Sequence, residues 1–208
     1  MEEGMRILNL YAGLGGNRRL WTAHTHTHHE ITAVEYDPEI AAVYQKLYPE
    51  DTVIVGDAHA YLEEHYKDYD FIWSSPPCQT HSSFRKNICV RFRGTKAVYP
   101  DFRLWQEIVF LQSYAPEGLK WVVENVIPYY RPLIQPTVKL QRHFFWSNFE
   151  INPKEFPTEK LRSAQIPDLQ RIHGIDLTNV SLRNKRQCLR NCTHPAIGLY
   201  VLEQAMTE

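Results

Sequence analysis

Short apolar runs alternate with amphipathic stretches over the first 150 residues of the chain. The apolar runs predict buried strands, and the stretches with helical spacing of apolar positions predict helices between them. The predicted strands are residues 6–11, 31–35, 52–55, 69–73 and 120–123, with a closing pair at 138–141 and 143–147. The predicted helices are residues 38–47, 59–66, 102–114 and 196–206. This alternation predicts a doubly wound α/β fold, mostly parallel, with an antiparallel closing strand.

The regular alternation of predicted strands and helices ends near residue 149. Prolines at 153, 157 and 167, interleaved with Asn and Asp, predict irregular structure until Pro195. We therefore expect three parts: a main α/β part (1–149), a small irregular region (150–190), and a C-terminal loop and helix (191–208) that packs back on the main part.

The amino-acid composition excludes several classes of protein. A length of 208 residues fits one domain, and 43% hydrophobic with 23% charged residues excludes wholesale disorder. We find no apolar run long enough to cross a bilayer, so we expect no membrane partner. Four cysteines in no dense array suit a reducing compartment, which predicts a cytoplasmic protein.

The net charge of −1 hides an uneven distribution. Residues 1–75 carry 13 acidic and 5 basic side chains, whereas residues 76–208 carry 11 acidic and 18 basic ones. A polyanionic partner would therefore be met by the second part of the chain.

Three successive strand ends carry residues typical of an adenosine pocket. Gly13, Gly15 and Gly16 follow the first strand, where absent side chains allow close backbone approach to a ligand. Glu35 ends the second strand and could receive both ribose hydroxyls, and Asp57 follows the third and could accept from an adenine amino group. The alternative for either acid is a helix N-cap or a solvated loop. The glycine spacing is neither a nicotinamide nor a triphosphate motif, so S-adenosylmethionine is the expected cofactor.

The fourth and fifth strands end in a candidate nucleophile and a candidate acid. Cys78 follows two prolines that hold the backbone extended, and we expect the following helix start to lower its pKa. Glu124 lies among apolar residues, which should raise its pKa toward a value useful for proton donation.

The segments NLYAGLGG, VEYDPEIAAVY, GDA, PPCQ, ENV and NCTHPAIGLYVLE occur in this order over about residues 6–206. Together they resemble the conserved blocks of C5-cytosine methyltransferases, with a Rossmann-like, S-adenosylmethionine-dependent fold. The resemblance implies that Cys78 attacks cytosine C6 and that Glu124 acts at N3. It also implies cofactor contacts by Tyr11, Ala12, Gly13, Gly15, Gly16, Glu35, Tyr36, Asp57, Ala58, Pro77, Asn191 and Thr193.

One block of the family is altered. The family has Gln-x-Arg-x-Arg, whose arginines hold the flipped base and the catalytic carboxylate; here the segment is Leu140-Gln141-Arg142-His143. Either Arg142 or His143 could fill the arginine role, and Arg142 is the candidate catalytic residue, a surface ion pair being its alternative.

The resemblance implies a DNA partner, a flipped cytosine and a reduced target-recognition region at 150–190. Phosphate contacts position a protein without specifying sequence, so we expect relaxed recognition. A separate specificity protein could supply recognition, and the host could be bacterial, archaeal or phage-infected, as in restriction–modification. The candidate nucleic-acid contacts are Gln79, Ser82, Arg85, Lys86, Arg91, Arg93, Arg183, Lys185 and Arg186.

Other hypotheses stay open. The same chemistry could act on tRNA or a free cytosine nucleotide, or the chain could be a catalytically silent regulatory relative. The His24–His29 stretch and the Cys188, Cys192 and His194 cluster with Cys89 are weak metal candidates, and we expect no metal.

Overall fold

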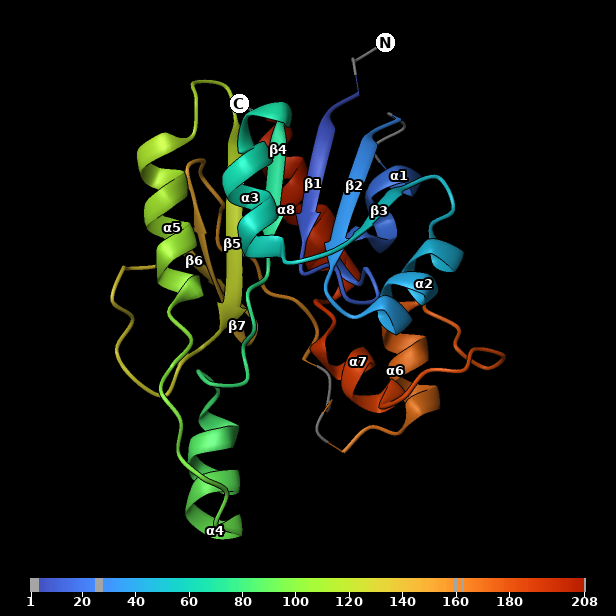
Figure 1. Cartoon of the computed structure of the whole chain (residues 1–208), viewed down its shortest axis with the longest axis vertical. Coiled ribbons are helices and arrows are strands. Elements are labelled where there is room, and N and C mark those ends of the chain that lie inside the picture. Colours follow the sequence, from blue (N-terminus) through green and yellow to red (C-terminus); the bar gives the residue numbers. More distant parts are fainter. Residues whose placement is uncertain (1–3, 25–27, 159–160, 162, 208) are drawn as a thin grey trace.

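The computed structural model describes residues 4–24, 28–158, 161 and 163–207 (Figure 1). The strands are β1 (Arg6–Leu10), β2 (Glu30–Glu35), β3 (Thr52–Val55), β4 (Phe71–Ser74), β5 (Lys120–Val126), β6 (Val138–Leu140) and β7 (His143–Ser147). They form one sheet in the order β3-β2-β1-β4-β5-β7-β6. Neighbours from β3 to β5 are parallel, and β7 is antiparallel to both β5 and β6. The predicted doubly wound sheet with an antiparallel closing pair is confirmed.

The helices cover both faces of the sheet (Figure 1). The α-helices are α1 (Trp21–His24), α2 (Pro38–Leu47), α3 (Ala58–His65), α4 (Arg91–Arg93), α5 (Arg103–Tyr114), α6 (Ile166–His173), α7 (Lys185–Asn191) and α8 (Pro195–Met206). Short turns of other helix types are η1 (Asn17–Leu20), η2 (Tyr66–Asp68) and the π-helical η3 (Arg85–Val90). In the described part of the chain, no helix has both the length and the apolar character needed to cross a membrane.

Alternation along the central strands builds two cores. Ile7 of β1 and Trp73 of β4 pack with α8, whereas Leu8 and Ile72, one position along, pack with α3 and α5. Both faces of each central strand are therefore apolar, as expected for a buried parallel sheet. This rigid centre holds the carboxyl ends of β1, β2, β3, β4 and β5 at one edge.

The region after residue 149 is more regular than predicted. Helix α6 begins beside Pro167, which occupies its first turn, and Gln165 with Asp168 forms a capping box there. Proline at the start of a helix costs no hydrogen bond, so reading Pro167 as an interruption was wrong. Helices α6 and α7 share an apolar cluster with Leu14 and Val43, which joins this region to the glycine-rich turn and α2.

Candidate active site

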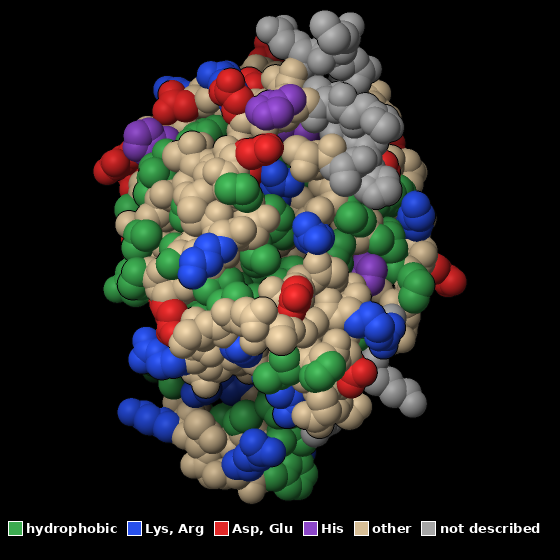
Figure 2. All heavy atoms as spheres, turned by 90° about the vertical axis from the view of Figure 1, so that its right-hand side faces the viewer, with side chains coloured by type: hydrophobic (Ala, Val, Ile, Leu, Met, Phe, Trp, Pro, Cys, Tyr) green, Lys and Arg blue, Asp and Glu red, His purple; other side chains and the backbone are tan. Residues whose placement is uncertain are grey.

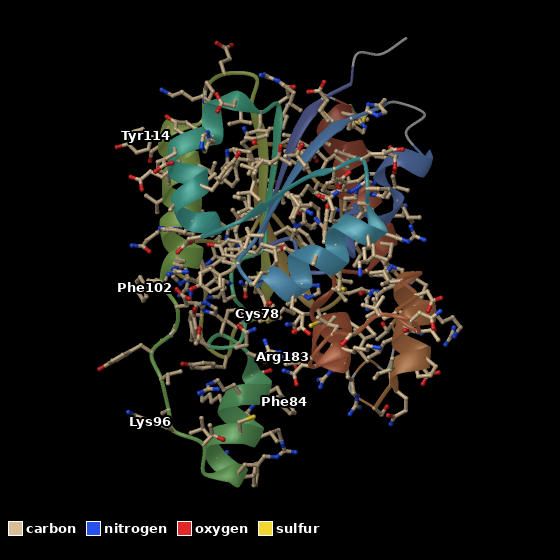
Figure 3. All side chains as sticks on the ribbon, turned by 45° about the vertical axis from the view of Figure 1, so that its right-hand side comes forward. Cys78, Phe84, Lys96, Phe102, Tyr114 and Arg183 are labelled. Carbon is tan, nitrogen blue, oxygen red and sulfur yellow. The ribbon has the colours of Figure 1, made fainter. Side chains whose placement is uncertain are left out.

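Cys78 lies in a turn that is tied to the end of β5. The Asn125 side chain donates to the carbonyl oxygen of Pro76 at 2.8 Å, which fixes the turn just before the cysteine. The backbone N–H groups of His81 and Ser82 both donate to the Cys78 carbonyl at 3.1 Å. These contacts hold Cys78 beside the strand that carries Glu124, at the carboxyl edge of the sheet (Figure 3).

Glu124 is a buried carboxyl group with hydroxyl partners. It is only 6% exposed. Ser75 Oγ donates to its Oε2 at 2.8 Å and Thr193 Oγ1 lies 3.4 Å from the same oxygen. Burial raises the pKa of Glu124 to about 6, while the two hydroxyl donors act in the opposite direction. The upward shift expected from its apolar neighbours is confirmed.

The pKa of the Cys78 thiol is shifted in the direction opposite to the one expected. Burial, and then the neighbouring Glu124 carboxylate, raise the pKa of Cys78 to about 11. The predicted lowering by a helix start was wrong, because burial and the Glu124 charge dominate, and the first helical residue after the cysteine is Ser83, five positions further on. The thiol is therefore protonated at neutral pH.

Two residues of the altered block approach this pair. The positive charge of Arg142 acts to lower the pKa of both Cys78 and Glu124. Its Nη2 donates to the carbonyl of Arg190 at 3.0 Å, which anchors the guanidinium. His143 Nε2 lies 3.5 Å from Glu124 Oε1, and burial lowers the pKa of His143 to about 3. Arg142 is thus the cation beside the pair, and His143 is a neutral neighbour.

A cavity of about 170 Å³ adjoins Arg142 and His143. His173 lines it and is fully buried, and neither of its ring nitrogens has a hydrogen-bond partner among the described residues. Burial lowers the pKa of His173 to about 4, so the ring is neutral. The cavity lining, which does not include Cys78 or Glu124, consists of Gln141, Arg142, His143, Thr158, Leu161, Ile172, His173, Cys192 and His194.

Glu35 links the glycine-rich turn to α2. Its Oε2 accepts from the Gly13 N–H and its Oε1 from the Asp37 N–H, both at 2.9 Å. Gly13 has φ +56°, and a Cβ there would meet nothing nearer than 3.9 Å, so its outer side is open. A Cβ on Gly15 or Gly16 would instead lie about 2.5–2.6 Å from atoms packed against it. Only Gly13 faces open space, whereas Gly15 and Gly16 allow close packing.

Asp57 makes the helix N-cap contact that the sequence analysis gave as the alternative to a cofactor contact. Its Oδ1 accepts from the His59 N–H at 2.9 Å at the start of α3, and its Oδ2 lies 3.7 Å from Arg103. The carboxylate remains exposed and has further acceptor capacity. Of the other predicted cofactor contacts at these strand ends, Ala58 is buried and Tyr36 is 76% exposed.

Glu107 of α5 was missed by the sequence analysis. It is fully buried and accepts three hydrogen bonds: from Tyr11 Oη and Ser74 Oγ at 2.5 Å each, and from His59 Nδ1 at 2.9 Å. It joins the glycine-rich turn, α3 and the end of β4. An available signal was its position on the apolar face of α5, between Leu104 and Ile108.

The C-terminal loop reaches both sides of the site. Thr193, expected near the cofactor, is buried against Glu124, whereas Asn191 is exposed and accepts from Gln187 at 2.8 Å. Among the described residues, no group of three or more His, Cys, Asp and Glu side chains is arranged to hold a metal. Of the His24–His29 stretch, residues 25–27 lie outside the described residues, and His29 Nδ1 accepts from the Met5 N–H.

The predicted phosphate contacts fall into two groups. In the C-terminal region, Arg183 pairs with Glu39 at 3.0 Å, Lys185 donates to the Leu177 carbonyl, and Arg186 donates to the Ala164 carbonyl. The others follow Cys78 on a segment that projects from the sheet edge (Figure 3). Figure 2 shows that Lys and Arg side chains gather toward the lower end of its view, where this edge lies. The second group is Gln79, Ser82, Arg85, Lys86, Arg91 and Arg93.

Comparisons with known proteins give one family match and several similar structures. The family model for C-5 cytosine-specific DNA methylase matches residues 5–126, which is more than half of the chain. The methyltransferase EhMeth of Entamoeba histolytica has a similar fold, with a TM-score of 0.53, 11% identity and 99% of each chain covered. Dnmt2 of S. pombe gives a TM-score of 0.47 and 15% identity over 77% of this chain and 59% of that chain.

A DNMT2 mutant of Spodoptera frugiperda gives a TM-score of 0.42 and 23% identity, and this chain spans about a third of its length (35%) while 58% of this chain is covered. No curated protein matches this sequence. The matched range includes the glycine-rich turn, the cysteine turn and the end of β5. The chain therefore belongs to the C-5 cytosine-specific DNA methylase family, whose members are S-adenosylmethionine-dependent cytosine-5 methyltransferases, and S-adenosylmethionine is its cofactor.

Proposed function

We propose that the chain is a DNA (cytosine-5)-methyltransferase that extrudes its target cytosine and acts through a covalent bond between Cys78 Sγ and C6 of the base. One observation carries this proposal: a cysteine and a buried carboxyl group stand at the ends of neighbouring strands. Ser75 and Asn125 tie the two strand ends together through bonds of 2.8 Å each.

The chemistry of cytosine explains why both groups are needed. C5 is a weak nucleophile because the ring is aromatic and electron-poor. Attack of the Cys78 thiolate forms the S–C6 bond and moves ring electrons toward N3, where Glu124 supplies a proton. The C4–C5 bond then belongs to an enamine, whose C5 is nucleophilic. Later loss of the C5 proton to a base breaks the S–C6 bond, and Glu124 recovers the N3 proton.

The pKa values of the two groups define the starting state. With a pKa of about 11 for Cys78 and about 6 for Glu124, the resting pair at neutral pH is a thiol and a carboxylate. Transfer of one proton between them creates the thiolate and the carboxylic acid without exchange with solvent. This transfer is uphill, because the pKa of Cys78 lies above that of Glu124. The Arg142 charge reduces this cost by favouring the thiolate.

The strand-end residues fit S-adenosylmethionine. Gly13 leaves open space at a backbone turn, and Glu35 and Asp57 present carboxylate oxygens at adjacent strand ends, β2 and β3. We infer that Glu35 holds the ribose hydroxyls and that Asp57 accepts from the adenine amino group. When bound, S-adenosylmethionine supplies the methyl group that C5 accepts.

A substrate comparison tests the proposal. Labelled S-adenosylmethionine is supplied with duplex DNA, tRNA or dCMP, for the wild-type chain and for Cys78→Ser. We expect label in DNA from the wild type and none from the variant. Label confined to tRNA or dCMP would replace the DNA assignment, and no label in any substrate would indicate a silent relative.

A second test addresses the covalent step. DNA containing 5-fluorocytosine cannot lose its C5 substituent as a proton, so the adduct to the enzyme should accumulate. We expect a stable band in denaturing gels from the wild type and none from Cys78→Ser. An active enzyme that forms no adduct at Cys78 would contradict the proposed intermediate.

A further inference from the structure

The segment of residues 85–102, here called the basic arm, projects from the sheet edge beside Cys78 (Figures 1 and 3). Its far end is attached to the cysteine turn, because the Asp101 N–H donates to Thr80 Oγ1 at 2.8 Å. Near its start, Ser82 forms an isolated β-bridge with Pro128. The arm is therefore anchored at both ends next to the nucleophile.

The arm carries an unusual concentration of exposed apolar side chains. Four of the nine large hydrophobic residues that are exposed in the described part of the chain lie within it. Phe92 is 73% exposed, Val98 44%, Tyr99 94% and Phe102 56%. Since scattered single residues of this kind are ordinary but a cluster is not, the arm has the character of a binding surface.

Positive charges are interleaved with these side chains. The arm has five cationic residues, Arg85, Lys86, Arg91, Arg93 and Lys96, against one acidic residue, Asp101. Within the described residues, none of the five forms an ion pair. An apolar protein partner would have to bury these charges without compensation, which is costly. A polyanion whose own units have flat aromatic faces would satisfy both the cations and the rings.

We propose that the basic arm is a stacking surface for unpaired bases, so that the preferred DNA is one whose bases next to the target cytosine are unpaired. Bases inside an intact duplex present only their edges and the phosphates, whereas unpaired bases expose faces that stack on Phe or Tyr. This inference rests on the proposed function for the choice of DNA. It goes beyond it by assigning the kind of DNA and the residues that select it.

The test compares three labelled DNAs of equal length at one salt concentration: a matched duplex, the same duplex with a mismatched bubble around the cytosine, and the single strand. Binding is measured by fluorescence anisotropy without cofactor. The variants are Phe92→Leu and Tyr99→Leu, which keep an apolar side chain but remove the ring. The control is Tyr114→Leu, because Tyr114 is 62% exposed at the other end of α5, away from the arm (Figure 3).

We expect wild type to bind the bubble more tightly than the matched duplex. Each arm variant should weaken bubble binding by about fivefold or more, as measured for single stacking contacts, with little effect on the matched duplex. Tyr114→Leu should bind all three DNAs as wild type does. Arg91→Gln should weaken all of them alike and flatten the salt dependence, since it removes a phosphate contact.

Equal binding of bubble and duplex by wild type, or equal losses on both DNAs in Phe92→Leu and Tyr99→Leu, would overturn the inference. All variants change exposed residues, and unchanged thermal melting confirms that they fold. Because the readout is binding alone, failure of DNA methylation with a bubble preference intact would refute the proposed function and leave the stacking surface standing. Methylation of DNA by an enzyme that shows no preference for the bubble would support the proposed function and refute the stacking surface.

Discussion

Replacement of Glu107 tests whether one buried carboxylate holds the cofactor side of the site together. Glu107→Gln keeps the size of the side chain and removes its charge. Its oxygen can still accept from Tyr11 and His59, and its NH2 group can donate to the Ser74 hydroxyl, which rotates to accept. The hydrogen bonds therefore persist but are no longer charge-assisted.

The magnitude follows from the three bonds to this fully buried group. A bond to a charged partner contributes roughly 1.5–3 kcal/mol and a neutral one roughly 0.5–1.5 kcal/mol. Glu107→Gln should thus lower the free energy of unfolding by about 1–1.5 kcal/mol for each bond, or roughly 3–4 kcal/mol in all. Glu107→Ala removes every partner and leaves a cavity, so about 3–5 kcal/mol is expected. Water can reach His59, whose side chain is 33% exposed, which limits the loss there.

Urea denaturation followed by tryptophan fluorescence measures both variants. Calorimetric titration with S-adenosylmethionine should show weaker binding by both, because Tyr11 is one of the predicted cofactor contacts and Glu107 holds it in place. Gln106→Ala, an exposed change one position away on α5, serves as the control. If Glu107→Ala costs less than about 1 kcal/mol, the carboxylate is not holding these elements and the reasoning is refuted.

Three further predictions concern the reacting pair and the packing beneath it. The thiolate–acid pair carries as many protons as the thiol–carboxylate pair, so kcat/KM should not depend on pH while the pair holds one proton. We expect kcat/KM to rise with pH up to the pKa of about 6 for Glu124 and then to stay level to about pH 9, well below the pKa of about 11 for Cys78. A fall of kcat/KM above pH 7 would contradict the internal proton transfer. Thr193→Val removes a donor to the Glu124 carboxylate, so the acidic limb of that profile should move to higher pH by less than about one unit, and a downward move would contradict the contact. Gly198→Ala would place a Cβ 2.1 Å from the Asn17 carbonyl oxygen inside the α8 contact, so urea denaturation should show a loss of roughly 1–3 kcal/mol, and an unchanged midpoint would show that the contact relaxes freely.

The sheet could be predicted because its signals are local. Residues 52–55 and 38–47 were predicted with the bounds that the structure has for β3 and α2. A parallel sheet then places successive strand ends at one edge, which is why Glu35 and Asp57 could be assigned together. Helix α6 was missed because Pro167 was read as a breaker rather than as a first-turn residue, and α7 was missed because its residues were assigned to the same irregular region.

The electrostatics of the site could be predicted only in part. The raised pKa of Glu124 followed from its own strand, where Val122, Val123 and Val126 flank it. The pKa of Cys78 depends on packing around the turn and on Glu124, a residue distant in sequence, and no local pattern reports either. Contacts such as Thr193 with Glu124 likewise join segments 69 positions apart, so the sequence alone offers no sign of them.

Consecutive serines at the end of β4 connect the two halves of the site. Ser74 donates to Glu107, and Ser75, the next residue, donates to Glu124. Adjacent residues of an extended chain point to opposite sides, so one strand end reaches a carboxylate on each side of the sheet edge. Glu107 in turn holds the glycine-rich turn through Tyr11, while Glu124 lies beside Cys78. A shift of β4 would therefore displace the cofactor turn and the reacting pair together, which couples their positions through a single rigid strand.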